Sequence, residues 1–433
     1  MNASTRDAGL VRSVGPWGLA ASIVNMVVGA SIFVVPAPLA ANVGLYAPLA
    51  IVVCAIAVGA VAVCFAEGGS RIPSSGGAYG YIEAAFGPMT GYAAGTLLWF
   101  GDALASGGIA AALADVVVQL LPPAVAAPAH ALIVVGTIGG IALVNMSGVD
   151  RGMRLVNGTT LVKLLPLAVF LLVGAFALHG ANFQHPAPVS GGGMGRAMIL
   201  AVFAFMGMET SLCASGEVAR PERTIPRALA IAMGSVTLLY VAIQIIAQGM
   251  LGSALASSSA PLADAMARVD PTLRLLMLAG TSLSMFGYLS SDILGSPRIL
   301  FAFARDGLLP SALGRVHPRS HAPHVAIACY ALFAILLALT GSFAELAVLS
   351  ALASAGFYIA GCAATWRLAR QGVARAGTPL NFRWLGIATV VGIGSMIALI
   401  ALASRTEILG LFALIGASVL IYVLQTRLFR RRG

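Results

Sequence analysis

Ionisable side chains inside long apolar runs are the first candidates for chemistry in this sequence, and the deepest are Asp102, Lys163, Glu209 and Asp292. A charge in the hydrocarbon of a bilayer is costly, so such residues usually mark a substrate or ion pathway. Lys163 is the only lysine among the 25 basic residues. Because a buried lysine can lose its proton near neutral pH whereas arginine keeps it, Lys163 is a candidate to carry a coupled proton or to replace a coupled cation permanently. The alternative is a lysine that extends to the inner membrane surface.

Two apolar segments are interrupted near mid-depth. The first carries the small residues Gly29, Ala30 and Ser31, and Pro36 follows about one helical turn later. The second carries Gly207, followed by a carboxylate at the same depth. Backbone can leave a helix inside a membrane only where it lines a cavity or is buried in protein.

An interrupted helix offers free peptide groups to a ligand. The N–H groups that begin one half-helix carry the positive end of its dipole and suit a carboxylate. The C=O groups that end the other half suit an ammonium group, so the two together form a receptor for a zwitterion. Glycines can also serve only close helix packing, but paired breaks in matching spans favour a transport site.

Membrane-spanning helices must hold these residues. Of the 433 residues, 59% are hydrophobic and 9% are charged, whereas soluble domains carry about 25% charged residues. A helix needs about 20 apolar residues to cross the hydrocarbon. The sequence predicts an all-α polytopic membrane protein with about twelve transmembrane helices, at 16–42, 45–66, 88–118, 129–147, 155–178, 196–218, 225–251, 273–304, 323–341, 344–369, 383–404 and 407–428.

The charges predict orientation and exclude several classes of function. Most of the 25 basic residues fall on one side of the predicted spans, which the positive-inside rule makes the cytoplasmic side. We therefore expect a multi-pass protein of a bacterial-type cytoplasmic (inner) membrane with both termini in the cytoplasm. The net charge of +10 then reflects topology and contact with the lipid bilayer, not nucleic acid. No Walker A motif, metal-ligand cluster or catalytic motif occurs, so we expect neither a pump driven by ATP nor an enzyme, and no cofactor or metal.

Several stretches, in the expected order along the chain, resemble motifs of the amino acid–polyamine–organocation (APC) superfamily of transporters. They lie at 29–33, 67–79, 203–209 with 216–227, and 296–310. The resemblance extends over most of the chain and implies a five-plus-five inverted repeat with discontinuous helices 1 and 6. It divides the single transporter domain into a cytoplasmic tail at 1–15, repeat one at 16–178, repeat two at 196–369 and two extra C-terminal helices at 383–428.

The resemblance implies a substrate site at the two interruptions. The substrate carboxylate would contact the amides of the first and the amine the carbonyls of the second. Phe203 would stand at the position of an aromatic gate, and Glu209 would fix the unwound segment or relay a proton. The implied binding residues are Gly29, Ala30, Ser31, Ile32, Asp102, Phe203, Ala204, Met206, Gly207 and Glu209.

The resemblance also gives expectations for coupling and specificity. Lys163 matches the lysine that takes the place of a sodium ion in proton-coupled or sodium-independent members, with hydroxyls of Ser290 and Ser291 as partners. Asp102 lies on the helix that lines the pocket for the substrate side chain. An unpaired carboxylate there would be costly, and a cationic amino acid or a diamine would remove that cost. The alternative is a carboxylate paired inside the scaffold or held protonated.

The sequence therefore predicts a secondary active transporter of amino acids, cationic ones or diamines among them, that works by alternating access and is proton-coupled or an exchanger. A sodium-coupled symporter and a neutral amino acid exchanger of the same architecture are the alternatives. The role of Asp292, the exact substrate and the oligomeric state stay open.

Overall fold

The structure is a computed structural model that describes residues 15–29, 31–72, 78–119, 121–148, 151, 155, 164–184, 191–212, 218–320, 322–374 and 379–430. Over these ranges the chain forms helices joined by turns, with no β-strand. The predicted all-α class is confirmed.

Each predicted span contains at least one described helix. The helices are α2 (Pro16–Val27), α3 (Ser31–Val34), α4 (Pro36–Val43), α5 (Ala47–Arg71), α6 (Ala78–Phe86), α7 (Pro88–Val118), α8 (Ala126–Met146), α10 (Leu164–Gly174), α11 (Gly191–Ala204), α12 (Met208–Leu212), α13 (Pro221–Leu251), α14 (Pro261–Ala267), α15 (Pro271–Gly295), α16 (Pro297–Arg305), α17 (His324–Thr340), α18 (Phe343–Arg370), α19 (Leu385–Ala401) and α20 (Arg405–Arg430). Short 3-10 helices are η1 (Gly44–Tyr46), η2 (Pro123–Val125), η3 (Gly180–Phe183), η5 (Gly252–Ser257) and η6 (Ser311–Gly314).

Many of these helices can cross a bilayer. Within the described ranges, eight helical segments have the length and hydropathy of membrane spans, and shorter apolar helices are α2, α10, α17 and α19. The predicted multi-pass membrane protein is therefore confirmed at this level. The pairing of 16–178 with 196–369 as inverted repeats stays a prediction.

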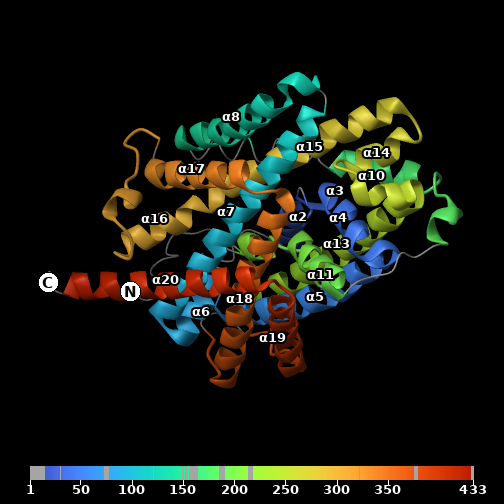
Figure 1. The fold of residues 1–433 in the computed structure, drawn as a ribbon. Helices are drawn as coiled ribbons and strands as arrows, with labels where there is room; N and C mark the ends of the chain where they lie inside the picture. Colours follow the sequence, from blue (N-terminus) through green and yellow to red (C-terminus); the bar gives the residue numbers. More distant parts are fainter. Residues whose placement is uncertain are drawn as a thin grey trace.

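Helix α7 lies at the centre of the bundle. In its apolar window 89% of the residues are buried inside the protein, against 11% in the window of Arg405–Thr426 on α20. Figure 1 shows α7 crossing the middle of the molecule, with α8 and α17 along one side and α18 and α19 on the other. Small residues allow this close packing: a Cβ added at Gly107 would lie 2.8 Å from the Cβ of Leu337 on α17. Side chains on α7 therefore face the interior of the protein.

Large apolar side chains on the peripheral helices point outward. Leu132 on α8 is 73% exposed, Val390 on α19 is 72% exposed and Leu409 on α20 is 67% exposed. In water such a surface would be a strong aggregation site, whereas in hydrocarbon it is the expected lipid-facing surface.

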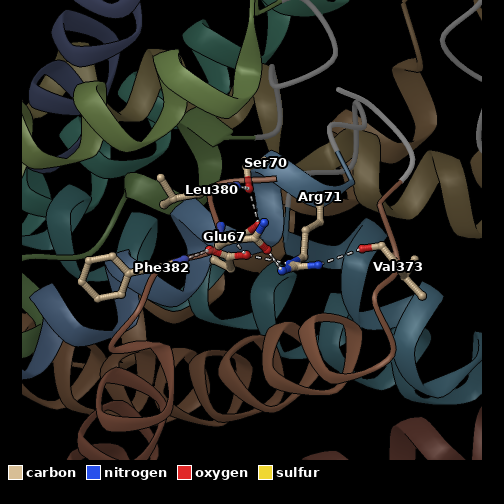
Figure 2. Close-up of polar contacts among 7 residues, drawn as sticks. Glu67, Ser70, Arg71, Val373, Leu380 and Phe382 are labelled. Atoms are coloured by element: carbon tan, nitrogen blue, oxygen red, sulfur yellow. Dashed lines mark hydrogen bonds and ion pairs between the residues drawn. The ribbon is translucent and has the colours of Figure 1, made fainter. Parts of the chain in front are cut away.

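A buried ion pair closes one end of α5. Glu67 lies near a predicted span end, where we expect a solvated carboxylate, yet its side chain is fully buried. Its Oε1 accepts from Arg71 Nε at 2.7 Å, and its Oε2 accepts from the Phe382 N–H at 2.9 Å (Figure 2). Arg71 also donates to the Val373 carbonyl at 3.2 Å and to Asn381 Oδ1 at 2.7 Å. The connection between α18 and α19 covers Glu67 and is fixed to the end of α5.

Candidate functional site

The first interruption predicted from the sequence is present. Helix α2 ends directly before a bend at Val28 and Gly29, and α3 begins at Ser31. Val35 joins α3 to α4, because its N–H donates to the Ser31 carbonyl at 2.8 Å and its carbonyl accepts from the Leu39 N–H at 3.1 Å. Helices α3 and α4 thus form one half-helix whose N-terminus lies at the bend.

The second interruption is also present and contacts the first. Helix α11 ends at Ala204, a turn covers 205–207, and α12 begins at Met208. Gly207 has φ +116, and a Cβ added there would lie 3.1 Å from the backbone carbon of Met26. The second interruption therefore packs closely against the last turn of α2, directly before the first interruption, in a conformation that glycine adopts without the strain of a side chain. Discontinuous helices 1 and 6 were both predicted.

Hydroxyl groups from two other helices hold the carbonyls that the first interruption leaves free. The Tyr240 hydroxyl on α13 donates to the Val27 carbonyl at 2.7 Å, and Ser284 Oγ on α15 donates to the Gly29 carbonyl at 2.8 Å. Both side chains are fully buried. Buried carbonyls need such partners, so α13 and α15 stabilise the bend.

Two further residues of α13 extend the same contact along α4. Gln244 Nε2 donates to the Pro36 carbonyl at 3.3 Å, and Gln248 Nε2 donates to the Gly44 carbonyl at 2.6 Å. With Tyr240 they repeat every four residues and share one helix face. Sequence reasoning missed this set, although polar residues at that spacing inside an apolar helix are a readable signal.

Glu209 fixes the second interruption. Its Oε2 accepts from the Gly207 N–H at 3.2 Å and from the Tyr358 hydroxyl on α18 at 2.8 Å. The glutamate is 2% exposed. The carboxylate thus joins the turn after α11 to the long helix α18.

A partly open cavity lies between the two interruptions, with about 410 Å³ of space outside the atoms, open solvent included. Of the residues predicted to bind substrate, Ile32 and Ala204 are buried beside the cavity without lining it, and Ala30 lies outside the described residues. The predicted residues that line it are Gly29, Ser31, Asp102, Phe203, Met206, Gly207 and Glu209. Sequence reasoning did not name the other lining residues, Met26, Val27, Ala105, Ile109, Thr210 and Tyr288.

Asp102 reaches the cavity from α7 and belongs to a buried hydroxyl–carboxyl group. Ser296 Oγ lies 2.6 Å from Asp102 Oδ2 and 2.8 Å from Asp292 Oδ1. Ser106 Oγ lies 2.6 Å from Asp292 Oδ2, and the Tyr330 hydroxyl also contacts this oxygen. These hydroxyls are the partners of Asp292, whose role the sequence left open.

The structure describes only two of the three predicted coupling residues. Lys163 lies outside the described residues. Ser290 and Ser291 lie on α15, where Ser290 Oγ donates to the Phe286 carbonyl of its own helix at 2.7 Å. Their role beside Lys163 stays a prediction, and Ser284 is the α15 hydroxyl that contacts the first interruption.

Broken helices that face each other across an internal cavity are typical of secondary transporters, which bind substrate near mid-bilayer at such breaks. The arrangement defines the class of this protein as a polytopic membrane transporter. Comparison with known proteins then gives the family: residues 14–406 match the model of the amino acid permease family, and the chain belongs to it. The predicted superfamily and the predicted absence of enzyme activity are confirmed.

Curated relatives carry transporter names. An uncharacterized transporter of Mycobacterium tuberculosis is 30% identical over 320 residues, covering 67% of this chain and 66% of the relative. The branched-chain amino acid permease BcaP of Bacillus subtilis is 27% identical over 385 residues, covering 82% of this chain and 79% of the relative. BcaP of Lactococcus lactis is 28% identical over 371 residues, covering 78% and 77%. The aligned part of this chain spans slightly less than two thirds of the mycobacterial relative.

Proposed function

We propose that this protein is a secondary active transporter that carries an amino acid across the membrane by alternating access between two inverted repeats. The observation that carries the proposal is the close approach of Gly207, in the second interruption, to the backbone of Met26 at the end of α2, beside the cavity that both interruptions line. Continuous helices would leave no peptide groups for a ligand, because each would already be bonded within its helix.

The first interruption suits the carboxylate of the substrate. Ser31 lines the cavity and begins α3. The first N–H groups of a helix have no partner within that helix, and they carry the positive end of its dipole. The amides of Ser31 and Ile32, with that of Ala30, are the proposed donors.

The second interruption suits the ammonium group. Phe203 and Met206 line the cavity where α11 ends. The Phe203 carbonyl accepts from the Met206 N–H at 3.2 Å, and a carbonyl oxygen has a second lone pair for another donor. The carbonyls of Phe203, Ala204 and Met206 are the proposed acceptors, with Phe203 as gate.

Two classes of substrate side chain have support. Asp102 lines the cavity and would attract a cationic amino acid or a diamine. Ala105 and Ile109, on the same helix as Asp102, add apolar side chains to the cavity lining, which suits a neutral side chain, and two relatives are named branched-chain amino acid permeases.

For coupling, we propose that Lys163 carries a proton or replaces sodium, which makes the protein proton-coupled or an exchanger. Sodium symport is the alternative. Because arginine is concentrated on one side of the spans, we also propose that both termini lie in the cytoplasm of a cell with a bacterial-type inner membrane.

Uptake into proteoliposomes tests the proposal. Purified protein should accumulate a labelled amino acid under an imposed proton gradient or with counter-substrate inside, and an imposed sodium gradient should have no effect. Competition by unlabelled lysine, ornithine, putrescine, leucine and isoleucine separates the two substrate classes. Absence of uptake and exchange for every amino acid, from protein that is folded and correctly inserted, would contradict the proposed function.

Two variants test the residue roles. Lys163→Ala should alter the pH dependence of transport, and wild-type rates at every pH would exclude both roles of Lys163. Asp102→Asn should abolish any preference for cationic over neutral amino acids. An unaltered preference would exclude Asp102 as the residue that selects a cationic substrate.

A further inference from the structure

The contact between Asp102, Ser296 and Asp292 has too few hydrogens if both carboxyl groups are ionised. Ser296 Oγ lies within hydrogen-bond distance of Asp102 Oδ2, at 2.6 Å, and of Asp292 Oδ1, at 2.8 Å. Each short oxygen–oxygen contact needs a hydrogen between its atoms, and a serine hydroxyl has only one to donate. One carboxyl group must therefore supply the second hydrogen.

The remaining contacts indicate which carboxyl group holds that proton. Asp292 Oδ2 faces two further hydroxyls, those of Ser106 at 2.6 Å and Tyr330. Donors that surround an ionised carboxylate stabilise its charge. Among the described residues, Ser296 is the one hydrogen-bond partner of Asp102, so the charge belongs on Asp292 and the proton on Asp102 Oδ2. In this arrangement Asp102 donates to Ser296, and Ser296 donates to Asp292.

A separate observation connects this group to the cavity. Asp102 is 8% exposed and lines the cavity between the interruptions. Within the described part of the chain, its second oxygen, Oδ1, has no hydrogen-bond partner. The carboxyl group is thus more than nine-tenths buried, yet it keeps one free oxygen on the proposed substrate path.

We propose that Asp102, Ser296 and Asp292 form a proton-binding site that exchanges its proton with the cavity through Asp102. This inference rests on the proposed function, because it assigns a coupled ion to the same cavity. Transfer within the site conserves the proton: Asp102 passes its hydrogen to Ser296 Oγ while the Ser296 hydrogen moves to Asp292 Oδ1. Asp102 then carries the negative charge and can take up the next proton from the cavity.

Other titratable groups near this site shape its field. Glu209 on α12 and Tyr288 on α15 line the same cavity. Tyr330 on α17 contacts Asp292, and Tyr358 on α18 donates to Glu209. Lys163 is outside the described residues. Because Asp102, Asp292 and Glu209 lie in one buried region, their mutual repulsion disfavours the ionisation of all three carboxyl groups.

The proton bears on the choice of substrate. With the proton bound, Asp102 is a neutral acid that faces the cavity, and no cationic side chain is needed to offset its charge. Proton loss would expose a buried carboxylate to the cavity, which is unfavourable without a partner. The inference therefore favours a neutral amino acid moved together with a proton over a cationic amino acid or a diamine.

Infrared difference spectroscopy on purified protein tests the site without any transport. Wild-type protein at neutral pH should show the C=O stretch of a buried protonated carboxylic acid. This band should be absent in Asp102→Asn and in Asp292→Asn, because either amide N–H₂ supplies the missing hydrogen to Ser296. Asp115→Asn, at an exposed site on the same helix, should leave the band unchanged. A wild-type spectrum without the band, or a band that persists in both variants, would overturn the inference.

Proton flux in proteoliposomes separates this inference from the proposed function. In wild type, amino acid entry should acidify a lumen that contains a pH-sensitive dye. Asp102→Asn should lower the number of protons that enter per amino acid transported, whatever its rate of substrate exchange. Acidification by Asp102→Asn at the wild-type ratio to substrate would overturn the proton site while leaving amino acid transport intact. Absence of exchange in wild type would instead contradict the proposed function. The infrared experiment would still test the proton site in that case, because it does not depend on transport.

Discussion

We expect that replacing Gly207 with alanine destabilises the protein, although the same substitution inside a regular helix usually stabilises it. In the interior of a regular helix, Gly→Ala stabilises a protein by about 0.5–1 kcal/mol, because alanine loses less conformational freedom on folding. Gly207 has φ +116 in the turn between α11 and α12. A side chain held in such backbone geometry costs on the order of 1–3 kcal/mol.

Steric crowding adds to this cost. The new Cβ would lie 3.1 Å from the backbone carbon of Met26 and 3.2 Å from its carbonyl oxygen. Backbone atoms in a packed bundle cannot move aside as a flexible side chain can. We therefore expect Gly207→Ala to lower the free energy of unfolding by on the order of 1–3 kcal/mol, and to reduce amino acid uptake because the two interruptions are pushed apart.

Thermal unfolding in detergent, with uptake in proteoliposomes, measures both effects. Gly234→Ala is the matched control, because Gly234 lies within α13 and a Cβ there meets no atom within 4 Å. The control should keep or raise the unfolding temperature, while Gly207→Ala should lower it. A Gly207→Ala protein as stable as the control, with normal uptake, would mean that helix 6 runs unbroken through this point.

Three further changes follow from particular contacts. Tyr240→Phe leaves the buried Val27 carbonyl without its 2.7 Å donor and should cost about 1–3 kcal/mol of unfolding free energy; an unchanged unfolding temperature would mean that this hydroxyl does not hold the bend. Arg71→Ala leaves the buried Glu67 without its ion-pair partner and should lower the free energy of unfolding by about 3–5 kcal/mol. Arg305→Ala, at an exposed ion pair, should change the free energy of unfolding by no more than about 0.5 kcal/mol. Equal effects of the two substitutions would contradict the buried contact. Hydrogen bonds from the Thr272 side chain and backbone hold the pKa of Asp270 below its usual value. A carboxyl group whose pKa is lowered in the folded state stabilises the folded protein at pH values above its unfolded pKa of about 3.9. This stabilisation is lost as the pH falls through the folded pKa. The unfolding temperature of Asp270→Ala should therefore lie below that of wild type at pH 7, and the difference should shrink below about pH 4; a difference that grows in acid would reverse the argument.

Sequence alone determined the class of the fold and the position of the two interruptions. Apolar runs of span length allow only a membrane protein built from helices, because every peptide group must be bonded within the segment. Gly29 and Gly207 could be read as interruptions because few other residues leave a membrane helix at low cost. The seven predicted residues that line the cavity follow from these local features and from the resemblance to a known family.

Only the tertiary structure decided which distant groups satisfy the buried polar atoms. Glu67 looks solvated from its place near a span end, yet residues more than 300 positions later in the chain cover it. The roles of Tyr240 and Ser284 became clear only because the structure shows that they donate to carbonyls of another segment, those of Val27 and Gly29. Asp102 and Asp292 share Ser296 because α7 packs against α15. This shared hydroxyl is the reason that one of the two carboxyl groups must hold a proton. Local sequence carries no record of such pairings, because hydrogen bonds between helices depend on how whole helices are placed, not on the neighbours of each residue in the chain.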